Sequence, residues 1–400
     1  MKKKILFVHE TFGRMAGAEQ NILVTGPHLA EAFDLECLYW SRSGKDEASF
    51  ERLFPVNHAV AFDGPPAETK ARVTDVLRRS APDLVYVHKC IANPVLDALT
   101  AWGGPLVRME HDHDIYCMRS YKYSPWNRRI CTRKAGPCCL FPCLAFLKRD
   151  RARGRFGVRL VSFRQQMRCI ALNQRFTAMF VVTQYMRDEL IRQGFDPARI
   201  HIFPPIPAPA GQSFASSFSP CNRILFAGQI IRGKGLDALL RALALCRQPF
   251  RLTVLGSGSH QAACERLARE LGLGDRVEFP GFVPFDQLAE YYREATLVAV
   301  PSLWPEPIAT IGLEVLRYGL PVVGFDAGGI RDWLRDGETG FLIPWMDLRA
   351  MAEKIDYLLA HKDEARRLGE QGRAFVNRDY AFDPYIERMK ATFRELMGNA

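Results

Sequence analysis

The sequence predicts an α/β protein with two domains, each built around a parallel sheet, and three observations carry this prediction. Short apolar runs alternate with longer amphipathic stretches along most of the 400 residues, a pattern typical of strands separated by helices. The stretch 203–220 is rich in proline and serine, cannot form a regular helix and suits a linker. A hydrophobic content of 48% is ample for more than one core. We therefore expect an N-terminal domain over 1–205, a second domain over 206–380 and a closing helix within 381–400.

Composition indicates the cellular setting. The chain has eleven cysteines and no recognisable signal peptide, which argues against a secreted disulfide framework. Basic residues at the start precede a short apolar run, Ile5 to Val8, which is expected to be the first strand. The longest apolar run, Cys138 to Leu147, contains a proline and is far shorter than the roughly 20 residues of a membrane span. We expect a cytoplasmic protein, at most peripheral at the inner face of a membrane.

The N-terminal half should continue as strands joined by helices. The later predicted strands are 35–39, 84–88, 105–109 and 177–183, and the predicted helices are one that starts near Gly17, 67–79 and 184–194. Strands that follow one another through helices form a parallel sheet, and ligands bind outside the carboxyl ends of such strands. The glycine turn between Gly13 and Gly17 is either a ligand cradle or an ordinary connection.

Ionisable side chains gather at two of these strand ends. His88 ends one strand, where a lone histidine is often structural, and His111, Asp112, His113 and Asp114 directly follow another. Four ionisable groups after a buried strand are costly unless they bind something. A divalent metal ion is one possibility, although no further ligand spacing supports it.

The formal net charge of +10 comes from a single segment. Between Arg119 and Arg168 the chain has fourteen Lys or Arg and one acidic residue, Asp150. Aromatic residues are interleaved with these charges: Tyr121, Tyr123, Trp126, Phe141, Phe146 and Phe156. Such a patch favours a polyanion, so nucleic acid, an anionic membrane surface and a lipid diphosphate all fit, and a solvated basic face is the alternative.

Cysteines are concentrated in the same insertion, 117–168. The five are Cys117, Cys131, Cys138, Cys139 and Cys143. No Cys-x2-Cys pair occurs among them, so reduced, partly buried thiols are the preferred interpretation, and an irregular structural metal site stays open.

The second domain should repeat the alternation of strand and helix. Its predicted strands are 224–228, 252–256, 277–283 and 321–325, and its predicted helices begin at Leu236 and Pro307, with a last helix over 384–397. Arg232 and Lys234 lie in the turn after the first of these strands, where cations can meet phosphate.

The stretch 301–344 holds the strongest signals. Pro307 fits the first turn of a helix that should end near Gly319. Free N–H groups at such a helix start favour phosphate, so a diphosphate is expected on three residues: Ile308, Ala309 and Thr310. Glu306 lies at the mouth of this site.

Glu314 lies deeper in the same predicted helix, roughly 10 Å along it at 1.5 Å per residue. The two carboxylates should therefore reach different parts of a ligand. A carboxylate suits a ribose diol, and Glu314 fits that role, which leaves Glu306 for a second polyol. For an isolated pair with this spacing, two solvated helix glutamates are the alternative.

The ordered set in this stretch resembles the donor site of the retaining GT-B glycosyltransferases of family 4. The set consists of Glu306, Glu314, Gly319 to Val323, Gly328-Gly329, and Asp336-Gly337 with Gly340. The resemblance implies two Rossmann-like domains facing a cleft. It also implies that Glu306 lies against the donor sugar, that Glu314 binds the nucleotide ribose and that the amides after Glu306 hold the diphosphate. Ile308-Ala309 stands where a typical member has Phe-Gly.

The resemblance extends to other donor-side residues. Lys234-Gly235 matches a Lys-Gly pair that binds the donor diphosphate, whereas Gln229 replaces an arginine that Arg232 could substitute. Gly256 and Val283 lie in two turns that match donor-side turns, and the turn at Val283 would approach the nucleobase.

The N-terminal half resembles the family more loosely. His111 matches the histidine that faces the donor sugar across the cleft, with His113 as a rival. Gly17 matches the acceptor-side glycine loop, and His88 and Asp112 are expected on the same side. The last helix would pack back onto the N-terminal domain, as in the family.

These features predict a retaining glycosyltransferase that moves a hexose from a UDP- or GDP-sugar to a saccharide or lipid-linked acceptor. The pathway would be polysaccharide, lipopolysaccharide or glycolipid assembly, with catalytic roles for His111, Glu306 and Lys234. A lysine and a helix start can stabilise the leaving diphosphate, so no metal and no further cofactor is expected. The expected partners include an anionic membrane surface but no nucleic acid.

Two other classes remain as alternatives. One is a binding protein that uses the basic patch without catalysis. The other is a dinucleotide-dependent oxidoreductase, which is disfavoured because no Gly-x-Gly-x-x-Gly with an acidic residue about 20 positions on follows any predicted strand.

Overall fold

The computed structural model describes residues 2–14, 17–62, 64–124, 128–149, 157–206, 216, 218, 222–284 and 287–398. Among the residues named above, Trp126, Asp150 and Phe156 lie outside this part of the chain, as does most of the proposed linker. The chain forms two compact units. The first contains Met1–Lys122, Thr132–Pro205 and Phe382–Ala400, and the second contains Tyr123–Cys131 and Ile206–Ala381.

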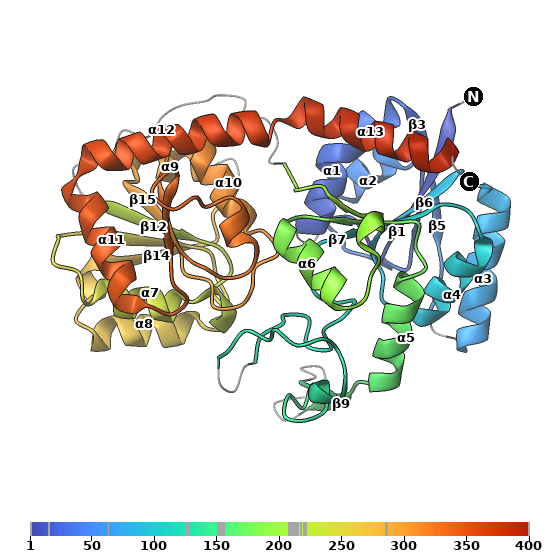
Figure 1. Ribbon diagram of the computed structural model, residues 1–400, viewed down its shortest axis with the longest axis horizontal. Coiled ribbons are helices and arrows are strands. Elements are labelled where there is room, and N and C mark those ends of the chain that lie inside the picture. Colours follow the sequence, from blue (N-terminus) through green and yellow to red (C-terminus); the bar gives the residue numbers. More distant parts are fainter. Residues whose placement is uncertain are drawn as a thin grey trace. The chain divides into compact units, whose positions relative to one another are not determined.

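The first unit is built on a seven-stranded parallel sheet with the strand order β11-β10-β7-β6-β1-β3-β5 (Figure 1). Its strands are β1 (Lys3–His9), β3 (Phe33–Tyr39), β5 (Val56–Ala59), β6 (Leu84–Lys89), β7 (Leu106–Glu110), β10 (Ala178–Val181) and β11 (Ile200–Ile202). Short strands outside this sheet form two pairs: β2 (Thr11–Phe12) with β4 (Ser41–Arg42), and β8 (Leu147–Arg149) with β9 (Val158–Leu160).

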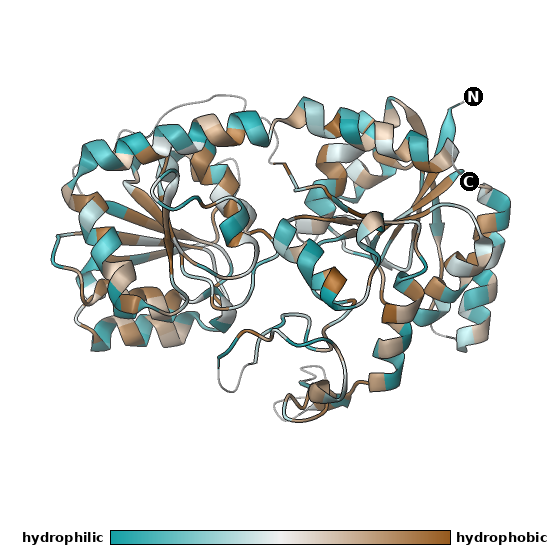
Figure 2. Ribbon diagram, viewed as in Figure 1, coloured by the Kyte–Doolittle hydropathy of each residue, from teal (hydrophilic) through white to brown (hydrophobic). Residues whose placement is uncertain are grey.

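Helices connect these strands. They are α1 (Gly17–Ala30), α2 (Glu47–Leu53), α3 (Pro66–Ser80), α4 (Asn93–Trp102), α5 (Phe163–Asn173), α6 (Gln184–Arg192) and α13 (Phe382–Gly398). Helices α3, α4 and α5 pack side by side, and α1 packs against α2 and α13. The strands of the sheet are mostly hydrophobic (Figure 2). Ile5, Phe7 and Tyr86 are fully buried because both faces of the central strands are covered.

The last helix, α13, packs within the first unit. Phe393 is fully buried and its ring lies 5.0 Å from that of Tyr86 and 5.7 Å from that of Phe180. The Arg388 guanidinium donates to the Ile202 carbonyl at 2.6 Å. The chain therefore returns to its first unit after the second is complete.

The second unit is built on a six-stranded parallel sheet with the order β14-β13-β12-β15-β16-β17. Its strands are β12 (Arg223–Ala227), β13 (Arg251–Leu255), β14 (Val277–Gly281), β15 (Leu297–Val300), β16 (Val322–Phe325) and β17 (Gly340–Ile343). Its helices are α7 (Leu236–Leu243), α8 (Gln261–Glu270), α9 (Leu288–Glu294), α10 (Thr310–Arg317), α11 (Leu348–Ala360) and α12 (Lys362–Asp379). The predicted fold class, α/β with two parallel sheets, is confirmed.

Part of the basic insertion packs with the second unit. Tyr123 belongs to the hydrophobic core of that unit, and Arg128 forms a two-pronged ion pair with Asp237 on α7, at 2.8 and 3.0 Å. Lys122, the residue before Tyr123, is instead buried in the first unit, where it forms an ion pair with Glu189 at 3.2 Å. Tyr123 is therefore a core residue and not part of an exposed aromatic cluster.

Candidate active site

The carboxyl edge of the second sheet is formed by closely stacked turns. The Gly228 amide donates to the Leu255 carbonyl at 2.9 Å, and the Gly256 amide donates to the Gly281 carbonyl at 2.7 Å. A Cβ at Gly256, whose φ is +131°, would lie 2.0 Å from the Gly228 carbonyl oxygen. The turns after β12, β13 and β14 thus depend on glycine to lie against one another.

Lys234 is positioned by a short 3-10 helix, η4 (Arg232–Lys234), that follows the β12 turn. The Gly233 carbonyl accepts from the Leu303 amide at 2.8 Å, and a Cβ at Gly235 would lie 1.9 Å from the Pro301 carbonyl oxygen. The loop therefore lies directly against the segment that follows β15. Arg232, at the start of η4, is exposed.

Glu306 is buried, with 4% of its surface exposed, and one carboxylate oxygen receives three donors. Its Oε1 accepts from Lys234 Nζ at 2.7 Å, Ser302 Oγ at 2.5 Å and Trp304 Nε1 at 2.6 Å. Charge-assisted bonds of this kind are short and strong. The pair of Lys234 and Glu306, predicted as site residues from separate motifs, is thus brought into direct contact.

The glycine pair after β16 holds the backbone of Glu306. The Glu306 amide donates to the Ala327 carbonyl at 3.2 Å, and the Gly329 amide donates to the Glu306 carbonyl at 2.7 Å. A Cβ at Gly328 would lie 2.5 Å from the Glu306 carbonyl oxygen. Gly328 is therefore needed for a close crossing of two chain segments.

The predicted start of the helix at Pro307 is wrong, because α10 begins at Thr310. The backbone around Glu306 is tied to the 327–329 segment, which prevents a helix from starting there. Ala309 precedes the helix in a left-handed conformation with φ 56°, and the Ile308 carbonyl accepts from Trp333 Nε1. Ile308 and Ala309 thus lie in a loop that leads into the helix.

The N-terminus of α10 has no side-chain cap, since Ala309 cannot provide one. Amide groups in the first turn of a helix that lack partners favour an anion. The expectation of an anion site at Thr310 therefore keeps its physical basis, although the helix begins later than predicted.

Glu314 lies in the middle of α10 and is partly buried. Its Oε1 accepts from the Tyr292 hydroxyl at 2.9 Å. Burial raises the pKa of Glu314 to about 7, and the Tyr292 hydrogen bond opposes that rise. Val283, expected beside the nucleobase, is half-buried two residues after the end of β14.

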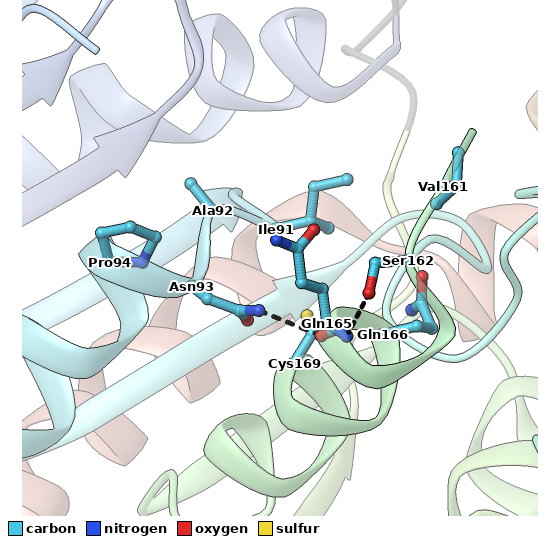
Figure 3. Close-up of a pocket in the computed structure, with 9 residues that line it drawn as sticks. All are labelled: Ile91, Ala92, Asn93, Pro94, Val161, Ser162, Gln165, Gln166 and Cys169. Atoms are coloured by element: carbon cyan, nitrogen blue, oxygen red, sulfur yellow. Dashed lines mark hydrogen bonds between the residues drawn. The ribbon is translucent and has the colours of Figure 1, made fainter. Parts of the chain in front are cut away.

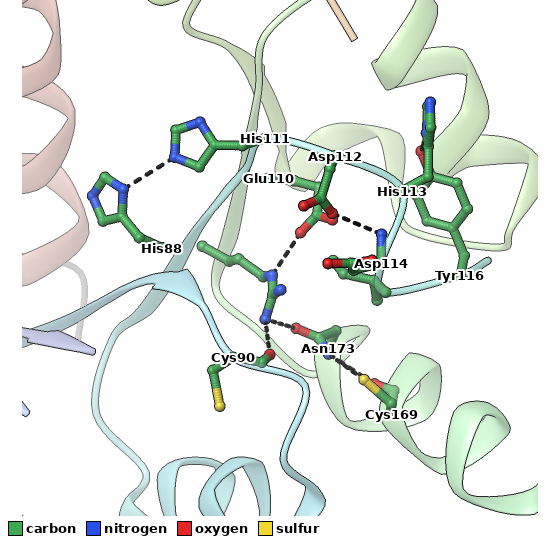
Figure 4. A network of polar contacts seen from close by, with 12 residues as sticks. His88, Cys90, Glu110, His111, Asp112, His113, Asp114, Tyr116, Cys169 and Asn173 are labelled. Atoms are coloured by element: carbon green, nitrogen blue, oxygen red, sulfur yellow. Dashed lines mark hydrogen bonds and ion pairs between the residues drawn. The ribbon is translucent and has the colours of Figure 1, made fainter. Parts of the chain in front are cut away.

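In the first unit, three histidines lie at the carboxyl ends of neighbouring strands. His9 is the last residue of β1, His88 is the last residue but one of β6, and His111 follows β7 directly. His88 Nδ1 and His111 Nε2 are 3.1 Å apart, so one ring donates to the other (Figure 4). His9 Nε2 lies 2.7 Å from Glu19 Oε1 on α1.

Burial sets the charge of this cluster. It lowers the pKa of His88 well below its ordinary value, and the pKa of His111 falls to about 3, also mainly through burial and next through the neighbouring His9. His88 and His111 are therefore neutral at pH 7. Their rings can orient a polar ligand by hydrogen bonds but carry no positive charge there.

A buried network lies beneath His111. Arg108 donates through Nε to Glu110 Oε2 at 2.7 Å and through a terminal nitrogen to the Cys90 carbonyl at 2.6 Å. Burial raises the pKa of Glu110 to about 8, against the opposing charge of Arg108. Asn173 extends the network to Cys169 on α5 (Figure 4). These contacts fix the strand end from which the His111 loop leaves.

The loop itself separates the ionisable residues. Asp112 Oδ1 accepts from the Asp114 amide at 2.8 Å, and burial followed by the Asp114 charge raises the pKa of Asp112 to about 7. His113 is buried and its Nδ1 lies 2.6 Å from the Tyr116 hydroxyl. The position of His113 is therefore that of a packed residue. Gly17 starts α1, and a Cβ there would meet no neighbouring atom within 4 Å.

Within the described residues, no group of three or more His, Cys, Asp or Glu side chains is placed to hold a metal ion. This includes the five cysteines of the insertion, all of which are free thiols in the structure. Arg119 holds this region by donating to the Cys143 carbonyl at 2.7 Å.

Sequence reasoning missed several residues that shape the two sites. Ser302 and Trp304 contact Glu306, Tyr292 contacts Glu314, and His9 pairs with Glu19. His9 could have been found, because it directly follows the predicted strand Ile5 to Val8 and so lies at a strand end, as His88 does. Tyr292 had no comparable signal, since it precedes its partner by 22 residues.

The chain has two α/β units, each with a parallel sheet and with polar residues at the carboxyl edge of that sheet. This is the architecture of the GT-B class of protein. Residues 15–205 match the family model of the glycosyl transferase 4-like domain, and residues 214–375 match that of the glycosyl transferases group 1. The chain belongs to the group 1 glycosyltransferases of family 4.

Curated relatives match part of the chain. A D-inositol 3-phosphate glycosyltransferase of Xylanimonas cellulosilytica is 32% identical over 52% of this chain and 54% of its own length. A GDP-mannose-dependent alpha-(1-6)-phosphatidylinositol monomannoside mannosyltransferase of Mycobacterium tuberculosis is 25% identical over 42% of this chain and 46% of its own. The chain thus spans about half the length of these relatives.

Solved structures match nearly the whole chain at low identity. Anabaena HepE in complex with UDP and glucose has a TM-score of 0.70 at 18% identity, covering 98% of this chain and 100% of that one. The lipopolysaccharide outer core galactosyltransferase WaaB has a TM-score of 0.72 at 15% identity, covering 98% of this chain and 99% of that one. At this level of identity the likeness establishes the fold.

Proposed function

We propose that the protein is a retaining glycosyltransferase that transfers a hexose from a UDP- or GDP-sugar to a saccharide or lipid-linked acceptor. The observation that carries the proposal is the arrangement around Glu306, where three donors converge on Oε1 beside the uncapped start of α10. The names of the relatives and neighbours, which include enzymes that use GDP-mannose or bind UDP and glucose, support this choice of donor.

The roles of the donor-side residues follow from these contacts. The donors at Glu306 all meet Oε1, so Oε2 is left to accept a hydroxyl of the transferred sugar. Departure of the nucleoside diphosphate creates negative charge on its outer phosphate. Lys234 has further N–H donors for that charge, and the first-turn amides of α10 add theirs. Arg232 is exposed on the same 3-10 helix and can approach the diphosphate.

Glu314 is assigned to the ribose, since an ionised carboxylate accepts hydrogen bonds from a diol. Gly256, in the turn after β13, is assigned to the nucleotide-sugar side, and Val283, after β14, is assigned to the nucleobase. In the first unit, His111 is assigned to the transferred sugar and His88 to the orientation of His111, because their rings share a hydrogen bond. Gly17 leaves open space at the start of α1 for an acceptor, and Asp112 is assigned to the same side.

No metal ion has a role in this proposal, because Lys234 and the start of α10 supply positive charge at the leaving group. Retention of configuration is the family expectation for this donor site. No carboxylate on the donor side is proposed as an enzyme nucleophile, because Glu306 is assigned to a hydroxyl of the transferred sugar and Glu314 to the ribose.

Ligand-dependent stabilisation tests the donor assignment. Free UDP, free GDP and their hexose conjugates are each added at about 100 times the dissociation constant, where one-site binding stabilises the protein by about 2.7 kcal/mol. A shift with one base and none with the other identifies the donor class. The anomeric configuration of the product, read by proton NMR before it equilibrates, tests retention. No stabilisation by any nucleotide would overturn the proposal.

Membrane contact by the basic insertion is a further part of the proposal. Within the described residues of the insertion, Phe141 is 72% exposed and Leu160 is 74% exposed, and basic Lys148 and Arg159 belong to the paired strands β8 and β9. Exposed apolar residues beside cations suit an anionic lipid surface. No helix in the described part of the chain is long and apolar enough to cross a bilayer.

Sedimentation with vesicles tests this contact. The protein should bind phosphatidylglycerol vesicles at low salt and less at high salt, because screening shortens the reach of the charges to about 8 Å at physiological ionic strength. Replacing Lys148 and Arg159 by glutamine should weaken vesicle binding without changing nucleotide affinity. A broader variant then replaces five cations of the insertion by glutamine: Lys148, Arg149, Arg151, Arg153 and Arg155. The last three of these lie outside the described residues. Retention of RNA without vesicle binding would replace the membrane by a polynucleotide.

A further inference from the structure

Trp304 connects Glu306 and Lys234, the two donor-side residues that come from separate motifs. Its indole Nε1 donates to Glu306 Oε1 at 2.6 Å, and Lys234 Nζ lies 5.2 Å from the centre of its ring. A cation at this distance from an indole ring is attracted to it. Because Lys234 also donates to Glu306 Oε1, at 2.7 Å, the three side chains form one closed set of contacts.

The backbone and the core fix the position of the Trp304 ring. The Trp304 amide donates to the Gly233 carbonyl at 3.2 Å. A Cβ at Gly233 would lie 2.8 Å from the ring, so a glycine is needed for the ring to pack this closely against the loop that carries Lys234. The ring is half-buried and packs against the hydrophobic core of the second unit. The place of its N–H is therefore set by contacts that do not involve Glu306.

The other two donors at Glu306 Oε1 are free to turn. Ser302 Oγ donates at 2.5 Å, but a hydroxyl rotates to suit its acceptor, and the stem of Lys234 is a flexible chain of four carbons. A glutamate carboxylate has a broad, roughly twofold torsion, which by itself does not distinguish its two oxygens. The rigid indole N–H therefore decides the orientation of the carboxylate, with Oε1 at the donors and Oε2 left for a ligand.

We infer that Trp304 is a positioning residue with two separable effects in the donor site. Its N–H orients the Glu306 carboxylate toward the transferred sugar, and its ring holds the Lys234 ammonium for the diphosphate. The inference rests on the proposed glycosyltransferase function and deepens it, because it assigns sugar binding and diphosphate binding to two parts of one side chain. The N–H should then matter only for a ligand that carries the sugar, whereas the ring should matter for any nucleoside diphosphate.

Isothermal titration separates the two effects. The ligands are UDP with UDP-glucose, or GDP with GDP-mannose, according to which base the wild-type protein binds. Trp304→Phe keeps an aromatic ring beside Lys234 and removes the N–H. Its affinity for the nucleotide sugar should fall about tenfold, or about 1.4 kcal/mol, since a hydrogen bond to a charged group is lost, while its affinity for the free nucleotide should stay within about twofold of the wild type.

Trp304→Leu removes the ring as well as the N–H. Because Lys234 then loses the attraction of the indole, affinity for the free nucleotide should also fall, by about two- to fivefold. Free-nucleotide affinity that is the same in Trp304→Leu as in the wild type would overturn the role of the ring.

Trp345 provides the matched control for the N–H. Trp345→Phe removes an indole N–H that donates to the Leu303 carbonyl at 3.1 Å, from a half-buried ring that packs against the same core. This variant should bind both ligands as the wild type does. If it loses as much nucleotide-sugar affinity as Trp304→Phe, a general loosening of this segment explains both losses and the inference fails.

Two serine variants complete the comparison. Ser302→Ala removes a rotatable donor to the same carboxylate oxygen, so it should weaken nucleotide-sugar binding less than Trp304→Phe does. Ser162→Ala removes the hydroxyl that caps α5 beside a cavity of about 260 Å³ in the first unit (Figure 3). It controls for a loss of stability away from the donor site and should leave both affinities unchanged. A loss in Ser302→Ala as large as that in Trp304→Phe would overturn the directing role of the indole.

The free nucleotide separates this inference from the proposed function. In a protein whose wild type binds nucleotide, an equal fall of both affinities in Trp304→Phe, or no change in either, overturns the role of the N–H and leaves the donor proposal standing. Absence of nucleotide binding by the wild type overturns the donor proposal and, with it, this inference.

Discussion

Nucleotide affinity should depend on pH through Glu314. The carboxylate must be ionised to accept hydrogen bonds from the ribose diol, yet burial raises the pKa of Glu314 to about 7 in the free protein. Because the raised pKa disfavours the ionised form, protonation competes with the ligand as the pH falls below 7. The expected loss of affinity is about fivefold between pH 7 and 6, and it approaches tenfold, or about 1.4 kcal/mol, per pH unit at lower pH. Above pH 8 the affinity should level off.

Isothermal titration of UDP or GDP, whichever binds, from about pH 5.5 to 8.5 measures this dependence. Glu314→Gln is the control, because its amide keeps the shape but cannot ionise, so its remaining slope reports the nucleotide's own titration. Tyr292→Phe removes the hydrogen bond that lowers the pKa of Glu314, so the midpoint should move to higher pH. An affinity that changes equally with pH in the wild type and in Glu314→Gln would refute the ribose role.

Three further predictions follow from the same unit. Ala309→Gly should stabilise the protein by about 0.5–1 kcal/mol, because the left-handed conformation at φ 56° costs an alanine about 1–2 kcal/mol and the greater freedom of glycine in the unfolded chain offsets part of this gain. Urea unfolding measures the change in stability, and a destabilised variant would contradict the prediction. Glu306→Ala should lower turnover by about a hundredfold while Glu314→Ala mainly weakens the binding of free nucleotide, and equal, unchanged nucleotide affinity in both variants would show that the roles are wrongly assigned. Activity should survive excess EDTA, since Lys234 and the start of α10 supply the charge; loss that one divalent ion restores would instead favour a metal at His111.

Most of the fold could be predicted because the strands are short apolar runs in regular alternation with helices. Predicted and observed bounds agree closely for β6, predicted as 84–88 and found as Leu84–Lys89, and for α3, predicted as 67–79 and found as Pro66–Ser80. The start of α10 could not be predicted, because Pro307 has the local character of a first helical residue. Hydrogen bonds from the Glu306 backbone to the segment after β16 decide the outcome, and they join residues about twenty positions apart.

The candidate site was partly predictable for a similar reason. Lys234 lies after a predicted strand, 224–228, and parallel topology brings the carboxyl ends of strands to one edge. The strand before Glu306, β15, was not among the predicted strands, so Glu306 was identified by its motif alone. Their direct contact follows from the order of the strands, since β12 and β15 are neighbours in the sheet. Trp304 had no motif of its own, and its role depends on the close packing of Gly233 against its ring, where a Cβ would lie 2.8 Å away.

The division of the basic insertion between the two units has a consequence for how the chain folds. Lys122 and Tyr123 are neighbours in sequence, yet Lys122 pairs with Glu189 in the first unit while Tyr123 packs in the core of the second. A chain cut after residue 205 would expose the Tyr123 ring. The C-terminal fragment would lose the partner of Asp237, which Arg128 supplies through two hydrogen-bonded contacts. Charge composition alone assigns Arg128 to a surface for an outside partner, whereas its ion pair makes it part of the fold around α7. The insertion therefore has two roles that its sequence does not separate: residues 123–131 complete the second unit, and the β8–β9 pair presents the cations and exposed apolar side chains.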